Sequence, residues 1–184
     1  MAPRIGTRVE LNSGDQIVCK VLAKLRHQNN RSKNVKNSKI GDQSDEMTDL
    51  QGIGAEVAFC RLFNIFPDLS IHTRSTQEDT GDAVLPTGET VDVKATHYPT
   101  GRLLAVPWKL PKVDLFSLMV GKFPIYTFKG FMRSSELIKP VRLGDLGHGN
   151  TYIATQDELK ELDKVRVTES DRLFSDEAIS NLTK

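Results

Sequence analysis

The amino-acid sequence predicts an α/β domain in which helices flank a mixed central sheet of about four or five strands. Two observations support this prediction. Apolar residues recur at helical spacing in two segments of the first third of the chain, and short β-rich runs punctuated by Pro and Gly fill the middle. A chain of 184 residues can bury one sizeable core, so we expect a single domain with irregular ends.

The composition excludes several classes of protein. Hydrophobic residues make up 38% of the chain and charged residues 27%, as in globular rather than disordered proteins. No apolar run approaches the roughly 20 residues of a membrane span, and the N-terminus lacks a signal-peptide core, so we expect no membrane partner and a cytoplasmic location. Cys19 and Cys60 are the only cysteines, which favours reduced thiols over a disulfide or a zinc site. The net charge of +1 does not decide whether the protein binds nucleic acid.

The chain begins with a segment that fits either an edge strand or an unpacked tail (1–15). A helix is then predicted from Asp15. The apolar stripe of this helix comprises Ile17, Val18, Val21, Leu22 and Leu25.

A basic arm follows the apolar stripe. Residues 16–41 contain seven Lys and Arg residues and no acid, and from position 27 they are rich in Asn and Ser. We expect this arm to stay mobile until it contacts a partner such as the DNA backbone, although a solvated linker explains the same composition. The candidate phosphate contacts in the arm are Arg31, Lys33 and Lys36.

A second helix is predicted from Asp49 to about Phe63, with Ser44 or Thr48 as its cap. Gly52 and Gly54 would let this helix approach a sheet closely. Glu56 stands out because its neighbours three and four positions away are uncharged. A carboxylate on such a face is costly unless it meets a cation, so Glu56 is either a metal or water ligand or a glutamate at the rim of the apolar face.

A β-hairpin is predicted next, with a first strand from Asp82 to about Leu85 and a second strand over 90–96. The turn between them is Pro86-Thr87-Gly88.

The hairpin would bring charged side chains together. Asp92, Lys94 and Thr96 alternate with apolar residues and therefore share one face of the second strand. If Val84 pairs with Thr90, Asp82 lies opposite Asp92 and the two carboxylates stand roughly 5 Å apart. Such a pair repels unless a cation lies between them, and Mg²⁺ or Mn²⁺ suits oxygen ligands. An ordinary hairpin with a solvated polar face is the alternative.

Further strands are predicted at 102–106, 113–120 and 125–132. The second of these is almost entirely apolar, as expected for a strand buried on both faces at the centre of a sheet. The loop before it contains Trp108, which would either stack on a base or, as a single tryptophan more often does, plug the core. Candidate substrate contacts in this part of the chain are Arg102, Lys109 and Lys112.

The C-terminal part predicts two short helices, at 134–138 and at 155–162 with a Thr cap. Between them lies a glycine-rich loop (144–150) without the ending of a phosphate-binding loop. Its His148 is a candidate auxiliary base, whereas His72 is expected to be structural. The alternative acids for the site are Glu78, Asp79 and Glu89.

Three features of the sequence form one pattern: Glu56 on the upstream helix, Gly81-Asp82, and, after nine intervening residues, Asp92-Val93-Lys94. This pattern resembles the core motif of the PD-(D/E)xK nuclease superfamily. The resemblance covers about residues 50–130, with Gly at position 81 where the motif has Pro. The surrounding sequence is also similar to small phage-encoded members.

The resemblance implies a restriction-endonuclease-like fold and hydrolysis of phosphodiester bonds in DNA with Mg²⁺ or Mn²⁺. Asp82 and Asp92 would bind the metal, Glu56 a second metal or a water, and Lys94 would orient the attacking water. Thr96 would contact phosphate. Such nucleases often pair to cut both strands, so a homodimer is one expectation.

The alternative function is a non-catalytic DNA-binding or assembly protein that keeps the nuclease fold. We divide the chain into a helix with a basic arm (1–48), a nuclease-like core (49–164) and a polar tail (165–184).

Overall fold

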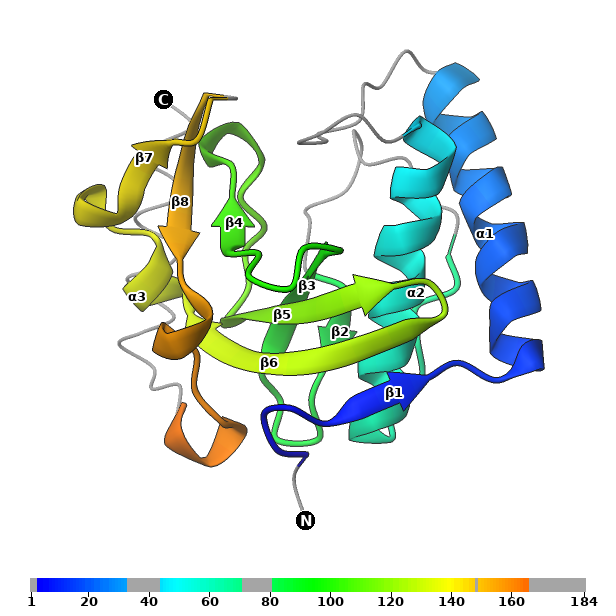
Figure 1. Ribbon diagram of the computed structural model, residues 1–184, viewed down its shortest axis with the longest axis horizontal. Coiled ribbons are helices and arrows are strands. Elements are labelled where there is room, and N and C mark those ends of the chain that lie inside the picture. Colours follow the sequence, from blue (N-terminus) through cyan, green and yellow to red (C-terminus); the bar gives the residue numbers. More distant parts are fainter. Residues whose placement is uncertain (1–2, 33–43, 71–80, 148, 166–184) are drawn as a thin grey trace.

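The computed structural model describes residues 3–32, 44–70, 81–147 and 149–165 (Figure 1). Two long helices pack beside a five-stranded sheet, and a second, three-stranded sheet lies across the molecule from them. This is the predicted α/β class with helices flanking a central mixed sheet. None of the helices in these ranges is both long and apolar enough to cross a membrane.

The central sheet has the strand order β1-β6-β5-β3-β2. Its strands are β1 (Arg8–Glu10), β2 (Ala83–Val84), β3 (Thr90–Thr96), β5 (Leu115–Lys122) and β6 (Ile125–Arg133). Strands β3 and β5 run parallel and the other neighbours antiparallel, which makes the sheet mixed. The nearly all-apolar strand β5 occupies the centre, as predicted, and the N-terminal segment supplies an edge strand.

Both faces of β5 are buried, against different layers. Leu115 and Met119 belong to a core shared with the two helices, whereas Phe116 and Leu118 belong to a core shared with the second sheet. The alternation of side chains along the strand therefore joins the two layers.

The two helices are α1 (Ser13–Ser32) and α2 (Asp45–Phe63), and they lie side by side (Figure 1). Ser44 caps α2 by accepting a hydrogen bond from the Met47 backbone N–H at 3.2 Å, as predicted, and Asn64 ends the helix in the left-handed conformation. The prediction of a mobile arm from residue 27 onward is wrong for residues 27–32, because α1 continues through them.

The face that α1 buries also differs from the expectation. Cys19, Leu22 and Ala23 are buried, whereas Ile17 and Val21 are 63% and 52% exposed. Val18 and Leu25 are exposed as well. Small side chains let two helices approach closely, so the helix packs through Cys19 and Ala23 rather than through the β-branched stripe.

Helix α2 is held against the β5–β6 turn by Gln51, and Gly54 allows it to come close. The Gln51 side chain donates to the Gly121 carbonyl at 2.7 Å and accepts the Phe123 N–H at 3.1 Å. The backbone carbonyl of Gln51 accepts the Tyr126 hydroxyl at 3.0 Å. A Cβ at Gly54 would collide with Tyr126, whereas one at Gly52 would meet nothing within 4 Å. Of the two glycines, only Gly54 permits the close approach.

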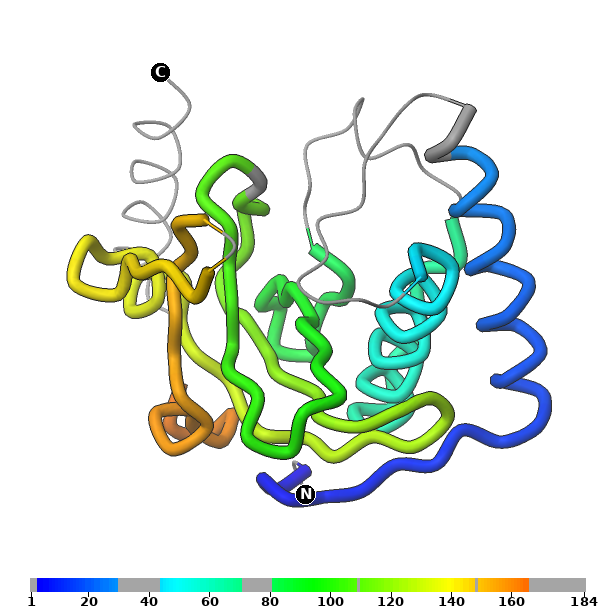
Figure 2. Tube along the Cα trace, turned by 45° about the horizontal axis from the view of Figure 1, so that its top comes forward, coloured from blue at the N-terminus to red at the C-terminus, as the bar shows by residue number. Residues whose placement is uncertain are grey.

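The second sheet has the order β4-β8-β7. Its strands are β4 (Leu103–Ala105), β7 (Leu143–Asp145) and β8 (Asn150–Ala154). The strand predicted at 102–106 therefore lies in this second sheet rather than in the central one, and the stretch predicted to be a loop (144–150) overlaps β7 and β8. Figures 1 and 2 both show β3 between this small sheet and the pair of helices.

The remaining elements are short. Helix α3 (Ser134–Leu137) was predicted, but the helix expected at 155–162 is two separate 3-10 turns, at Gln156–Glu158 and Leu162–Lys164. Between them Lys160 exchanges backbone hydrogen bonds with Phe131 of β6, which the residues of a continuous helix would not do.

The two cysteines are free and fully buried in the helix-side core. Burial, reinforced by nearby carboxylates, raises the pKa of the Cys19 thiol to about 11 and that of the Cys60 thiol to about 12.

Candidate functional site

The β2–β3 hairpin has the predicted register. Val84 pairs with Thr90 and Ala83 with Val91, and Asp82 directly precedes the first paired residue of β2. The Asp82 backbone N–H donates to the Val91 carbonyl at 2.8 Å, and the Asp82 carboxylate accepts the Val93 N–H at 2.7 Å. The Asp82 side chain is therefore fixed against β3 rather than free to turn into solvent.

Asp92 and Lys94 form a close ion pair on the neighbouring strand. Lys94 Nζ lies 2.7 Å from Asp92 Oδ2, and the two side chains are 35% and 8% exposed. Lys94 Nζ also stands 6.0 Å from the centre of the Phe116 ring. The pair is thus a nearly buried carboxylate with a half-buried ammonium at the rim.

Glu56 reaches the same cluster from α2 and meets a cation that the sequence analysis did not select. Arg26 of α1 donates from Nη1 to Glu56 Oε2 at 3.0 Å, and the two side chains are 18% and 15% exposed. Arg26 also donates to the carbonyls of Asp68 at 3.1 Å and Ser70 at 3.4 Å. Its guanidinium is therefore held in one orientation.

The pKa shifts of Asp82 and Arg26 have their causes in the other charged groups of the cluster as well as in burial. The pKa of Asp82 is raised well above its usual range, first by burial and then by the Glu56 and Asp92 carboxylates, while Lys94 and the Val93 N–H work in the opposite direction. Burial disfavours the charge of Arg26, yet Glu56 first, and Asp82 and Asp68 after it, keep the pKa of Arg26 raised. The cluster thus comprises three carboxylates and two cations.

No three His, Cys, Asp or Glu side chains in the described ranges form a ready-made metal-binding group. Two of the three carboxylates are instead turned toward cations, Glu56 toward Arg26 and Asp92 toward Lys94. The donor set is nevertheless of the all-oxygen type that a hard divalent cation prefers, and the mutual repulsion at Asp82 is what such a cation would relieve.

The candidate substrate contacts are dispersed. Thr96 ends β3 on the face that carries Asp92 and Lys94, and its hydroxyl accepts the Tyr98 N–H at 3.3 Å. Arg102 precedes β4 and Lys112 precedes β5, and both residues are exposed. Arg31 lies in the last turn of α1 and Lys109 in a 3-10 turn, and their side chains lie outside what the structure describes. Lys33 and Lys36 fall outside the described residues.

Trp108 is 68% exposed, so the expectation that it plugs the core was wrong. Tyr98 is 56% exposed as well and lies against His97, with ring centres 3.9 Å apart. Exposed aromatic rings of this kind are surfaces on which bases stack.

The alternative acids do not join the cluster within the part of the chain described. Glu89 lies at the hairpin turn, as expected, where it accepts a hydrogen bond from Thr87. Glu78, Asp79, His72 and His148 lie outside the described residues.

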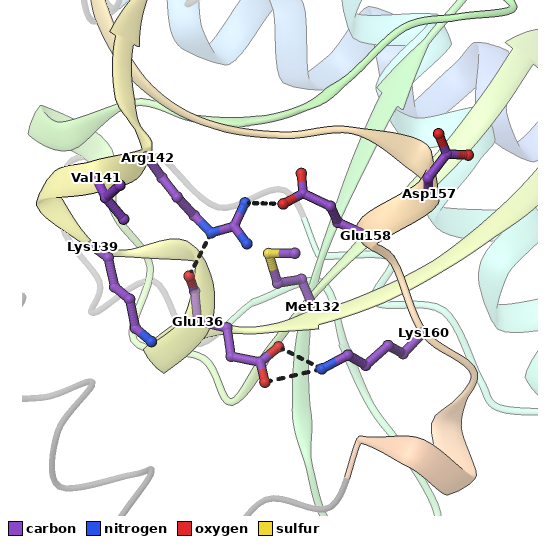
Figure 3. Close-up of a pocket in the computed structure, with 8 residues that line it drawn as sticks. All are labelled: Met132, Glu136, Lys139, Val141, Arg142, Asp157, Glu158 and Lys160. Carbon is purple, nitrogen blue, oxygen red and sulfur yellow. Dashed lines mark hydrogen bonds and ion pairs between the residues drawn. The ribbon is translucent and has the colours of Figure 1, made fainter.

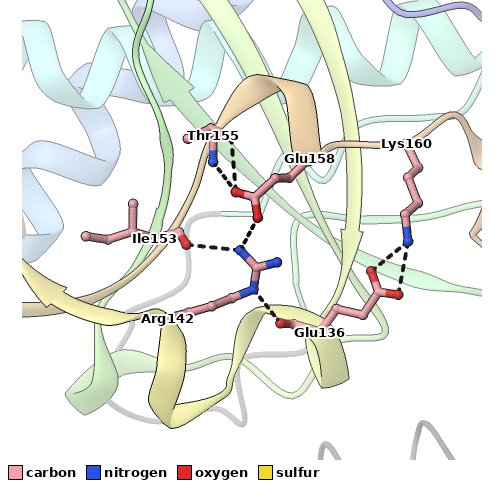
Figure 4. Close-up of polar contacts among 6 residues, drawn as sticks. All are labelled: Glu136, Arg142, Ile153, Thr155, Glu158 and Lys160. Atoms are coloured by element: carbon pink, nitrogen blue, oxygen red, sulfur yellow. Dashed lines mark hydrogen bonds and ion pairs between the residues drawn. The ribbon is translucent and has the colours of Figure 1, made fainter.

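A separate hollow of about 690 Å³ lies between α3, the turn at Pro140–Arg142 and the turn at Gln156–Glu158 (Figure 3). Four of its charged side chains form two ion pairs, Arg142 with Glu158 at 2.9 Å and Lys160 with Glu136 at 3.1 Å (Figure 4). Arg142 also donates to the Glu136 and Ile153 carbonyls, so it ties three segments together. This network is a structural clamp, and none of the predicted site residues lines the hollow.

Arg26 is the site residue that the sequence analysis missed. It was counted only as one of seven cations in the basic segment, and its partner Glu56 is 30 positions away. The available signal was indirect: a carboxylate isolated on its own helix requires a cation from elsewhere, and α1 was the nearest basic element.

The chain belongs to a family of unknown function, DUF5843, whose model matches residues 2–122. That span contains Arg26, Glu56 and both strands of the hairpin. Comparisons with curated proteins and with solved structures gave no match.

Proposed function

We propose that the protein is a Mg²⁺- or Mn²⁺-dependent nuclease that hydrolyses phosphodiester bonds in DNA. The observation that carries the proposal is the meeting of Glu56, from a helix, with Asp82, Asp92 and Lys94, from a hairpin, in one partly buried cluster. The resemblance of these residues to the PD-(D/E)xK motif supports the same function independently of the contacts.

In this proposal Asp82 and Asp92 hold the metal, and Glu56 completes the site by binding a second metal or a water. A bound divalent cation supplies stabilisation of the charge that develops on the phosphate. The oxygen of a water forms a bond to phosphorus, the bond from phosphorus to one sugar oxygen breaks, and a proton passes from the water to solvent while the leaving oxygen gains one.

Lys94 acts on the attacking water. Asp92 fixes the ammonium from 2.7 Å away, and Thr96 lies two residues further along the same face to contact a phosphate oxygen. A fixed positive charge orients the water and favours the loss of its proton. We further propose that the protein acts in the cytoplasm, where its two free thiols would stay reduced.

The second candidate is a DNA-binding or assembly protein without catalysis. It is favoured by the pairing of Glu56 with Arg26 and of Asp92 with Lys94, since satisfied ion pairs also occur as purely structural networks. The exposed rings of Trp108 and Tyr98 would serve either function.

The test is cleavage of labelled linear duplex, supercoiled, single-stranded and four-way-junction DNA with Mg²⁺, Mn²⁺ or EDTA. Wild type and Lys94→Ala are compared with Lys139→Ala, which removes an exposed lysine beside the separate hollow. We expect cleavage that requires metal, is lost in Lys94→Ala and persists in Lys139→Ala. DNA binding without cleavage of any substrate under either metal would favour the second candidate.

A further inference from the structure

We propose that Arg26 sets the charge balance of the candidate site, so that the metal-loaded site attracts one DNA phosphate. This inference rests on the nuclease proposal and assigns a role to a residue outside the motif. Arg26 comes from α1, and its guanidinium donates to Glu56 on α2 at 3.0 Å.

Arg26 is held in place rather than resting on the surface. Its side chain is 18% exposed, and the carbonyls of Asp68 and Ser70 accept from the two nitrogens that do not bind Glu56. Movement of the guanidinium into solvent would break three hydrogen bonds, one of them to the Glu56 carboxylate. Its positive charge is therefore a permanent part of the site.

The positive charge of Arg26 matters because it changes the net charge of the cluster. In a site that holds a cation Asp82 is ionised, so Glu56, Asp82 and Asp92 carry three negative charges against the two positive charges of Arg26 and Lys94, a balance of one negative charge before the cation is counted. One divalent cation turns the balance into a single positive charge, which one phosphodiester would neutralise. Without Arg26 the loaded site would be neutral and would offer the phosphate no net attraction.

The same guanidinium opposes the metal. It repels a cation and competes with it for Glu56, so Arg26 weakens metal binding while it strengthens substrate binding. This opposition distinguishes a charge-setting role from a structural one, because loss of a merely structural contact would weaken both.

The test compares Arg26→Gln, which can keep a hydrogen bond to Glu56 but loses the charge, with Arg26→Lys, which keeps the charge. Arg61→Gln is the control, since the Arg61–Asp15 pair also joins α2 to α1 and the Arg61 guanidinium binds Asp15 rather than a carboxylate of the cluster. Mn²⁺ affinity is measured by calorimetry on EDTA-treated protein, and KM for the DNA substrate is measured with Mg²⁺.

For Arg26→Gln we expect Mn²⁺ to bind about threefold to tenfold more tightly and KM for DNA to rise. Arg26→Lys and Arg61→Gln should stay near wild type in both measurements. Unchanged or weaker Mn²⁺ binding by a folded Arg26→Gln would overturn the inference, as would an Arg26→Lys variant that behaves like the Gln variant. A wild type that binds no Mn²⁺ and cuts no DNA would overturn the nuclease proposal together with it.

Discussion

Asp82 accepts the backbone N–H of Val93 at 2.7 Å, so a carboxylate at the start of one strand is bound to the strand that carries the other acid. This hydrogen bond holds the carboxylate where Glu56 and Asp92 repel it, and the raised pKa of Asp82 reflects that repulsion together with burial. The arrangement is destabilising by itself, which is typical of a site built to receive a cation.

Asp82→Asn should therefore stabilise the protein in EDTA. The amide oxygen can still accept the Val93 N–H, while one of three mutually repelling charges disappears. We expect a gain on the order of 1 kcal/mol, or about 2–4 °C in Tm, by thermal denaturation at pH 8. Asp157→Asn, at an exposed position beside the separate hollow, should leave Tm unchanged. A lower Tm for Asp82→Asn would show that the carboxylate is structural.

Asp92→Asn should abolish the stabilisation that metal confers. A cation that binds only the folded chain raises Tm in proportion to its occupancy, and Asp92 is the most buried of the proposed ligands. The measurement is Tm against Mn²⁺ concentration, with EDTA restoring the starting value. An equal rise in wild type and variant would place the metal elsewhere.

Gly54→Ala should destabilise the protein by about 2–3 kcal/mol, because the new methyl group would collide with Tyr126 and lie 2.7 Å from the Phe123 ring. Gly52→Ala, two positions earlier in the same helix, has open space and should gain up to about 1 kcal/mol of helix propensity. Urea denaturation measures both. Similar effects of the two substitutions would contradict the packing of α2 on the β5–β6 turn.

Leu22→Ala should cost about 2–3 kcal/mol, whereas its neighbour Val21→Ala should change stability by less than about 0.5 kcal/mol. Leu22 is 7% exposed and Val21 52% exposed. The apolar stripe read from the sequence would make the two substitutions comparably costly, so the pair tests which face of α1 is buried. Chemical denaturation of the two variants decides the matter.

Glu158 should contribute stability that is lost in acid. The Thr155 N–H first, and Arg142 after it, lower the pKa of Glu158 below its usual value. The contribution of Glu158 to stability is therefore present above the unfolded pKa of about 4.3, and it disappears as the pH falls through the lower folded pKa. The Tm of wild type should exceed that of Glu158→Gln at pH 7, and the difference should shrink below about pH 4. A difference that does not vary with pH would argue against the Arg142 ion pair.

Local sequence signals predicted the parts of the fold that local chemistry determines. The Pro-Gly turn and the Val-rich flanks fixed the β2–β3 register, and an unbroken apolar run placed β5 at the centre of the sheet. Four site residues were selected because their chemical types and their spacing form a single recognisable pattern: Glu56, Asp82, Asp92 and Lys94.

The misassigned parts depend on long-range contacts. Which side of α1 is buried depends on how closely α2 approaches it, and Cys19 and Ala23 permit that approach. Arg26 meets Glu56 across 30 positions of sequence, and β7 forms within a glycine-rich stretch because β8 pairs with it. Periodicity within one segment carries no information about such partners.

Cys19 and Cys60, the only thiols in the chain, are both fully buried and have raised pKa values. A thiol reagent at neutral pH therefore meets very little thiolate, and that buried, while the molecule stays folded. The native cysteines become reporters of opening events, because their rate of modification follows the population of open molecules. A single cysteine introduced on the surface would conversely be labelled alone, so fluorescent probes can follow substrate binding without prior removal of the natural thiols.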